Sequence, residues 1–286
     1  GILEDIAVFF CGWQESIKPR LNKIQTIIFA GNHGVCNQGV NSFPQSVTHE
    51  MVLNFKNGGA AINQLCKSAS INLKVIPIDL DRPTNDISLG PAMNEEDFLY
   101  SINKGIESIN KTSDLIVLGE MGIGNSTIAS AILSASFGGS IKKWVGRGTS
   151  NNDNLISKKI DVINKALKSN INREPLQILM SLGGREQAAI LGAVLAARAF
   201  KIPVLIDGFI CTSSIVPLFL LEKNLLDHCI FGHCSMEKGH KHLLEMINKK
   251  ALLDLNMHLG EGSGAMVALG VIQAAINCHN GMASFK

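Results

Sequence analysis

Short apolar runs alternate with longer stretches of helical periodicity along most of this chain. Six runs predict strands, over residues 26–30, 73–80, 115–118, 176–182, 203–206 and 229–231. Most are apolar at nearly every position, which is typical of strands buried on both faces of a parallel sheet. Helical periodicity is clearest over 3–16, 48–68 and 186–200. The pattern therefore predicts an α/β fold with a parallel six-stranded sheet and helices on both faces.

Polar, glycine-rich loops follow five of the six predicted strands. They are AGNHG, LGEMGIGN, LGGRE, IDGF and FGHCS. The carboxyl ends of parallel strands meet at one edge of the sheet, where such loops build a binding site. Five loops meeting at one edge indicate a site more strongly than any one of them does alone.

The most distinctive of these loops follows the third predicted strand. Gly122 and Gly124 let the backbone approach a phosphate closely. Asn125, Ser126 and Thr127 are good helix N-cap residues, and a strand, loop and capped helix direct backbone N–H groups at an anion. The Gly-Lys-Ser/Thr ending of triphosphatases is absent, and Thr127 replaces the third glycine of the dinucleotide fingerprint. Taken alone, the loop also fits an ordinary strand–helix turn.

Two carboxylates stand among glycines. Glu120 lies beside the expected phosphate loop, where its charge would repel a phosphate, so a separate purpose is expected for it. Glu261 lies between Gly260 and Gly262 at the start of a predicted helix. A helix-start acid that the dipole favours is one interpretation. Glycine on both sides favours a carboxylate that must meet a flat ligand.

Composition narrows the classes of protein. Lysine and arginine total 26 against 24 acids, so no nucleic-acid footprint is predicted. No apolar run reaches the roughly 18–20 residues that a membrane span needs. The start, GILEDIAVFFCGWQ, has acids before its apolar run and no basic region, so no signal peptide is predicted. The 7 cysteines lack a paired framework and predict reduced thiols in a cytosolic protein.

Several segments together are similar to one known family. They are AGNHGVCNQGVNSFPQSVTHEMVLNF, GEMGIGNST, GRGT, LIDGFI and LGEGSGA. From about residue 3 to its end, the chain resembles the nicotinate-nucleotide–dimethylbenzimidazole phosphoribosyltransferases, which build the lower-ligand nucleotide of cobalamin. The resemblance implies a Rossmann-like large domain over 20–245, a small helical domain from 1–19 plus 246–286, and a cytoplasmic homodimer. It also implies that the family's first helical segment is missing from this chain.

The resemblance further implies a reaction and its residues. Phosphoribose would move from nicotinate mononucleotide to 5,6-dimethylbenzimidazole without a cofactor or metal, because nicotinate leaves from a pyridinium nitrogen. Glu261 would be the general base, and Glu120 would stabilise positive charge on the ribosyl ring. The phosphate would be held by Gly122, Gly124, Asn125, Ser126, Thr127 and either Lys158 or Lys159. The nucleotide would be held by Gly146, Gly148, Ser235 and Asp207, the last suiting ribose hydroxyls. The base pocket would include Phe43, Met51, Met121 and Leu259.

Some positions differ from the family pattern. Asn32 replaces an aspartate usual before His-Gly, and Ser150 replaces a glycine common after GRGT. Phe43 and Met51 stand where some members carry polar residues, so the acceptor base stays open, with adenine and phenols among the alternatives. A nucleotide-binding relative without turnover is the competing hypothesis.

Three further features are also consistent with ordinary structural roles. His33 fits either a site role or a turn. The four residues His233, Cys234, His240 and His242 have no standard zinc spacing. Asp79 and Asp81 follow a strand but are not adjacent, which indicates a strand-end turn rather than a magnesium–pyrophosphate site.

Overall fold

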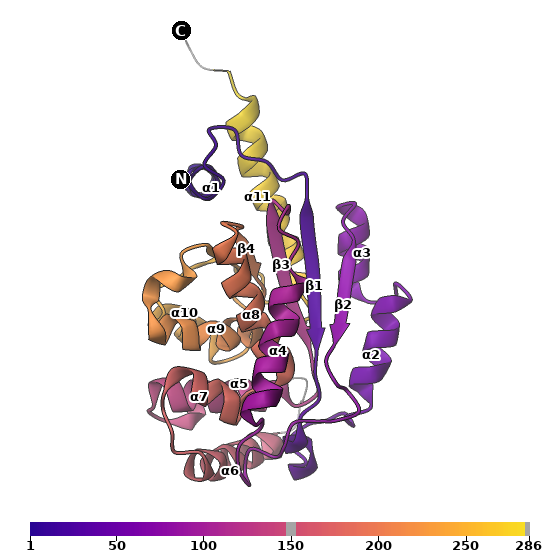
Figure 1. The fold of residues 1–286 in the computed structure, drawn as a ribbon, viewed down its shortest axis with the longest axis vertical. Coiled ribbons are helices and arrows are strands. Elements are labelled where there is room, and N and C mark those ends of the chain that lie inside the picture. Colours follow the sequence, from indigo (N-terminus) through magenta and orange to yellow (C-terminus); the bar gives the residue numbers. More distant parts are fainter. Residues whose placement is uncertain (147–152, 284–286) are drawn as a thin grey trace.

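The computed structural model describes residues 1–146 and 153–283, and one six-stranded sheet forms its centre (Figure 1). The strands are β1 (Ile24–Ala30), β2 (Leu73–Pro77), β3 (Leu115–Met121), β4 (Val204–Ile206), β5 (Cys229–His233) and β6 (Ala251–Leu253). Their order is β2-β1-β3-β4-β5-β6, and every neighbouring pair is parallel. The predicted α/β class and parallel six-stranded sheet are confirmed.

Helices cover both faces of this sheet. They are α1 (Ile2–Trp13), α2 (Val47–Lys56), α3 (Ala61–Ser68), α4 (Glu95–Ser108), α5 (Asn125–Phe137), α6 (Asp153–Ser169), α7 (Pro175–Leu182), α8 (Arg185–Ala199), α9 (Phe209–Leu221), α10 (His240–Met246) and α11 (Ser263–Gly281). Short 3-10 turns span Gly34–Gln38, Ile141–Lys143 and Lys223–Leu226. Among the described residues, no helix is long and apolar enough to cross a membrane.

Alternation along the strands sends side chains into two separate cores. In β3, Ile116 and Leu118 pack into one core together with helices α4, α5, α7, α8 and α9. Leu115 and Val117 of the same strand pack into the other core, together with α1, α2, α3 and α11. Successive side chains of a strand point to opposite faces, so a strand buried on both faces is apolar at every position. This explains the continuous apolar runs from which the strands were predicted.

The fourth predicted strand is wrong, because residues 176–182 form helix α7. Pro175 occupies the first turn of the helix, where its fixed φ is suitable and its missing N–H costs nothing. Ile178, Leu179 and Leu182 then bury one face at helical spacing. A short apolar run does not distinguish a buried strand from a buried helix by its periodicity. The true sixth strand is β6, whose three half-buried residues carry no clear pattern.

The helix expected over 48–68 is divided into α2 and α3. Gly58 takes a φ of +77° between them, in the left-handed region that ends helices. Glycine reaches this region without a steric penalty, so the chain turns here before α3 begins.

The two ends of the chain lie together over one face of the sheet. Helix α1 packs beside α11 (Figure 1), and the Asn280 side chain donates to the Pro19 carbonyl at 2.8 Å. Ile6, Phe10, Leu269 and Ile272 share one core with residues of β1 and β3. Strand β6 also falls inside the segment 246–286 and pairs with β5. The division into a large and a small domain stays a prediction.

Candidate active site

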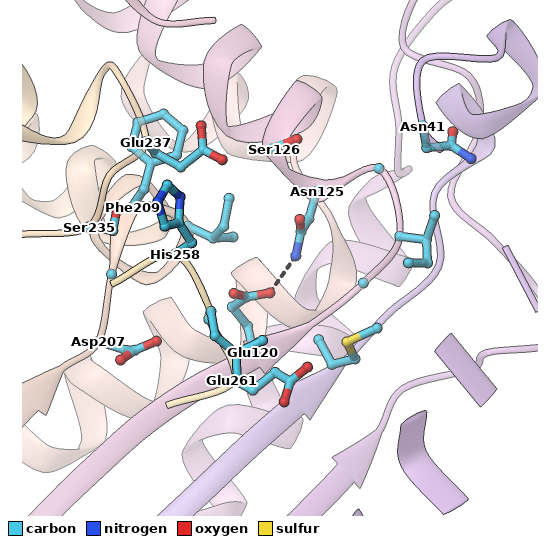
Figure 2. A pocket seen from close by; sticks show the side chains of 18 of the residues that line it. Asn41, Glu120, Asn125, Ser126, Asp207, Phe209, Ser235, Glu237, His258 and Glu261 are labelled. Carbon is cyan, nitrogen blue, oxygen red and sulfur yellow. Dashed lines mark hydrogen bonds between the residues drawn. The ribbon is translucent and has the colours of Figure 1, made fainter. Parts of the chain in front are cut away.

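A cavity of about 170 Å³ lies at the carboxyl edge of the sheet, among the loops that follow β3, β4 and β5. Five segments line it, namely residues 40–42, 120–126, 207–210, 233–237 and 258–261, and Lys159 of α6 adds a further wall. Figure 2 shows the side chains of Glu120, Glu237 and Glu261, which come from three of these segments, around the same space. The edge at which the polar loops were expected to meet is therefore hollowed.

The glycine-rich loop after β3 is held from both sides. The N–H of Ile123 donates to Thr48 Oγ1 at 3.1 Å, and its carbonyl accepts the Cys36 thiol at 3.1 Å. Gly124 has a φ of +94°, which favours glycine, and it is the N-cap of α5. A Cβ on Gly122 would lie 2.7 Å from the Gly31 carbonyl oxygen, so this loop lies against the loop after β1. The amino end of α5 therefore faces the cavity, as an anion site requires.

Lys159 lies beside this helix start. It is buried, and its Nζ donates to Ser126 Oγ at 3.1 Å. Burial lowers the pKa of Lys159, while the charge of Glu237 across the cavity raises it. Lys158 has its Nζ close to Gly39 and does not line the cavity. The described contacts thus place one of the two candidate lysines at the expected phosphate position.

Glu120 is the last but one residue of β3 and is only 6% exposed. Its Oε2 accepts a short hydrogen bond from the Asn125 amide, which Figure 2 draws as a dashed line. Burial raises the pKa of Glu120 well above its usual range, and the charges of Asp207, Glu186 and Glu261 raise it further. The hydrogen bond from Asn125 opposes this shift only in part. Glu120 therefore holds its proton to a higher pH than a solvated glutamate does.

Glu261 reaches the same cavity from the segment before α11. It has a φ of +66°, and Gly262 follows with a φ of +79°. A left-handed conformation is unusual for a residue with a side chain, and such residues gather at functional sites. Burial, and then the charge of Asp207, raises the pKa of Glu261 to about 7. A carboxylate with this pKa is suited to accept a proton near neutral pH.

Gly119 explains how these two carboxylates come together. A Cβ at this position would lie 2.6 Å from the Gly262 nitrogen and 2.9 Å from the Glu261 carbonyl carbon. The turn before α11 therefore rests directly on the backbone of β3, one residue from Glu120. Only a residue without a side chain allows this approach.

Asp207 lines the cavity but is almost fully buried. Its two oxygens accept the N–H groups of Gly262 at 3.0 Å and Ala265 at 2.8 Å. The predicted role of Asp207 in binding ribose hydroxyls stays a prediction. The structure shows that its carboxylate also accepts these two backbone hydrogen bonds.

The other predicted residues divide into two groups. Those that line the cavity are Met121, Gly122, Gly124, Asn125, Ser126, Ser235 and Leu259. Those outside its lining are Thr127, which is buried in α5, half-exposed Phe43, and Met51, which packs on the core under α2. Gly146 packs against Glu237, because a Cβ there would lie 2.1 Å from Glu237 Oε2. Gly148 falls outside the described residues.

Some cavity residues escaped the sequence analysis as site candidates, among them Asn41, Phe209, Glu237 and His258. Glu237 and His258 each lie just beyond a motif that was recognised, FGHCS and LGEGSGA respectively. Extending those motifs by two or three residues would have included both. Phe209 lies within the recognised motif LIDGFI, and Asn41 lies within the long segment that begins AGNHG, but neither residue was singled out there as a site candidate.

The histidines near β5 are held by neighbouring polar groups. His240 Nδ1 accepts the Ser235 N–H at 2.9 Å, and its Nε2 lies 3.2 Å from Thr212 Oγ1. Burial lowers the pKa of His240 to about 3, so its ring stays neutral. His240 thereby fixes Ser235 at the cavity wall. Among the described residues, no group of three histidine, cysteine or acidic side chains is arranged to hold a metal ion.

His33 lies behind the cavity and does not line it. Its Nε2 is 3.1 Å from Glu186 Oε1, and both side chains are fully buried. A Cβ on Gly122 would lie 2.8 Å from His33 Nε2, so the ring packs against the glycine-rich loop. The interpretation as a plain turn residue misses this contact.

Known proteins resemble this chain over its whole length. A phosphoribosyltransferase family model matches residues 1–286. The nicotinate-nucleotide–dimethylbenzimidazole phosphoribosyltransferase of Rhodobacter capsulatus is 50% identical over 285 residues, which cover 100% of this chain and 85% of that protein. The enzyme of the same name from Mesorhizobium japonicum is 49% identical over 287 residues with the same coverage. The crystal structure of CobT from Thermus thermophilus has a TM-score of 0.91 at 33% identity and covers 100% of this chain and 91% of its own.

Proposed function

The chain belongs to the nicotinate-nucleotide–dimethylbenzimidazole phosphoribosyltransferase family, and we propose that it catalyses the transfer which that name describes. It moves 5-phosphoribose from nicotinate mononucleotide to 5,6-dimethylbenzimidazole. The products are nicotinate and α-ribazole 5′-phosphate, the lower-ligand nucleotide of cobalamin.

One observation links the proposed reaction to particular residues. Glu120 and Glu261 come from opposite halves of the chain, yet both line one cavity with the glycine-rich loop at 122–124 (Figure 2). A phosphate at the amino end of α5, beside Lys159 and Ser126, would leave the ribose extending toward the two carboxylates. The phosphate anchors the donor, and the acidic part of the cavity receives the groups that become positive.

Glu261 suits the base that this transfer needs. One ring nitrogen of the benzimidazole attacks the anomeric carbon from the face opposite nicotinate. The bond from that carbon to the pyridinium nitrogen breaks, and its electron pair stays on the nitrogen of neutral-ring nicotinate. The acceptor's other ring nitrogen then carries a surplus proton, which the Glu261 carboxylate accepts. Removing such a base usually costs about 10²–10⁴-fold in rate.

Glu120 suits a charge-stabilising role that depends on the donor. Burial, and then the charges of neighbouring carboxylates, raise the pKa of Glu120. A pyridinium nucleotide brings positive charge next to it, which favours the carboxylate again. The ionised form then stabilises positive charge on the ribosyl ring as the nicotinate bond lengthens.

The test is conversion of nicotinate mononucleotide and 5,6-dimethylbenzimidazole, followed by chromatography of nicotinate and α-ribazole 5′-phosphate. Glu261→Gln should lower kcat by about 10²-fold or more because the amide cannot take the proton. Glu107→Gln is a matched control, since Glu107 is exposed on α4 and away from the cavity. Full activity of Glu261→Gln would refute the base assignment. Tight nucleotide binding by calorimetry without release of nicotinate would favour the relative without turnover.

We also propose that the chain acts as a homodimer in the cytoplasm. Large apolar side chains stand exposed on α1 and in the segment before α11, including Val8 and Leu255, and a second copy would bury such surface. All seven cysteines are free, which fits a reducing compartment. Sedimentation equilibrium of the purified protein gives the oligomeric state, and a monomer at all concentrations would contradict the first part.

A further inference from the structure

Asp207 makes contacts that a ribose ligand does not need. It follows β4 directly and is 1% exposed. Its Oδ2 accepts the Gly262 N–H at 3.0 Å, and its Oδ1 accepts the Ala265 N–H at 2.8 Å. The first amides of a helix have no partner within that helix, and a cap normally comes from a residue just before it. Here the cap of α11 comes from a strand more than fifty residues earlier in the chain.

The two amides belong to the turn that carries Glu261. Glu261 and Gly262 are both left-handed, and the turn rests on Gly119 of β3. Such a backbone keeps its shape only where its surroundings hold it. Gly119 supports the turn from one side, and the Asp207 carboxylate supplies the directional bonds from another.

A buried histidine packs beside the Asp207 carboxylate. His233 Nε2 lies 3.5 Å from Asp207 Oδ1, and the imidazole is almost fully buried. The ring fills the space over two glycines, because a Cβ would lie 2.0 Å from its Cδ2 on Gly264 and 3.0 Å from its Nε2 on Gly208. His233 and Asp207 therefore have little freedom to move apart.

We propose that Asp207 is a positioning residue for Glu261, holding its turn through the Gly262 and Ala265 amides instead of contacting the ribose. The inference rests on the proposed function only in taking Glu261 as the base. Asp207 binds the backbone of the turn that must hold Glu261 in place during the reaction. In this role, Asp207 itself touches no reacting atom.

The same contact has an electrostatic consequence. The negative charge of Asp207 raises the pKa of Glu261, second only to burial. Other charged or titratable groups face this corner from their own elements: Glu120 on β3, His233 on β5, His240 on α10, and Glu186 on α8, whose charge also acts on Glu120. Lys159 and Glu237 line the same cavity, and His258 lies on the segment that carries Glu261. Removing the charge of Asp207 alone should therefore lower the pKa of Glu261.

Asp207→Asn separates this role from others. Its amide group can accept only one of the two N–H groups and presents a donor to the other, so kcat should fall by about tenfold or more as Glu261 shifts. The acid limb of the pH profile of kcat/KM should move down by about one pH unit. Asp114→Asn is the matched control, because Asp114 also accepts two backbone N–H groups, from Asn22 and Lys23, far from the cavity. It should leave the acid limb where it is.

Two outcomes would overturn the proposal. One is an Asp207→Asn enzyme with an unmoved acid limb, which is what a merely structural cap would give. The other is a raised KM for nicotinate mononucleotide with unchanged kcat, which would indicate a ribose contact.

A second measurement needs neither a variant nor turnover. Residue-resolved hydrogen–deuterium exchange of the wild-type protein should show slow exchange at Gly262 and Ala265, comparable with Asn22 and Lys23. If these two amides exchanged as fast as those of a free peptide, Asp207 would not be holding the turn through them, and the proposal would be overturned. If the wild-type protein lacks transferase activity while these amides are protected, the proposed function fails, but the proposal that Asp207 holds this turn stands.

Discussion

The close approach of the Glu261 turn to β3 gives a demanding prediction for Gly119→Ala. The added Cβ would lie 2.6 Å from the Gly262 nitrogen and 2.7 Å from its Cα, whereas ordinary contact begins at 3.4 Å. The obstacle is backbone on both sides, so no side chain can swing away to make room. The turn must move by roughly 0.8 Å, the difference between these distances. Glu261 moves with it and leaves its position opposite the acceptor base.

The magnitude follows from this displacement. A misplacement of about 1 Å at a reacting group costs about 10²-fold in rate. Overpacking a buried contact costs about 1–3 kcal/mol of stability. Gly119→Ala should therefore lower kcat by about 10²-fold, change the KM for nicotinate mononucleotide little, and unfold at a lower urea concentration.

Gly270→Ala is the matched control for this experiment. Gly270 lies within α11, and no atom is within 4 Å of a Cβ there. Alanine inside a helix is favoured over glycine by about 0.5–1 kcal/mol, so this variant should be slightly more stable and fully active. Initial rates with saturating 5,6-dimethylbenzimidazole and urea unfolding curves give both quantities. If the Gly119→Ala enzyme had the kcat of the wild type, the proposed packing of the Glu261 turn against Gly119 would be refuted.

Three further predictions test the charges of the cavity. Since the pKa of Glu261 is raised to about 7 and the base must be ionised, log(kcat/KM) should fall as the pH is lowered below 7, and a plateau down to pH 5 would contradict this assignment. Lys159→Met should raise the KM for nicotinate mononucleotide by about 10–100-fold but leave turnover of the riboside without phosphate unchanged, whereas exposed Lys165→Met should alter neither. The folded state raises the pKa of Glu120 above 4.5, so the folded protein binds more protons than the unfolded chain. The free energy of unfolding therefore falls as the pH rises from about 4.5 through the raised pKa of Glu120. Glu120→Gln should therefore be more stable than the wild type in urea at pH 8, with a smaller difference at pH 5, and the reverse trend would show that Glu120 is ionised in the empty cavity.

Much of the sheet could be predicted because burial on both faces imposes a continuous apolar run. The run at 115–118 has this character, and its strand continues through Gly119 and Glu120 into the site. The run at 176–182 looks similar, but Pro175 and helical burial make it a helix. Strand β6 was missed because three half-buried residues contain too little pattern to recognise.

The site was predictable where the backbone itself demanded unusual residues. The glycines at 122, 124, 260 and 262 marked both the glycine-rich loop that lines the cavity and the turn that carries Glu261. The contacts of Asp207 were not predictable, because they join residues more than fifty positions apart whose spacing has no local signature. The elevated pKa of Glu120 likewise arises from burial and then from the charges of Asp207, Glu186 and Glu261, which only the folded chain brings together.

We propose that one cavity binds a phosphate on the loop 122–126 and presents Glu261 to the acceptor base. A crystal structure with α-ribazole 5′-phosphate tests it most directly. We expect the phosphate at the amino end of α5 beside Lys159, and the free ring nitrogen about 2.6–3.2 Å from a carboxylate oxygen of Glu261. A product bound elsewhere, or one in this cavity with its base turned away from Glu261, would contradict it.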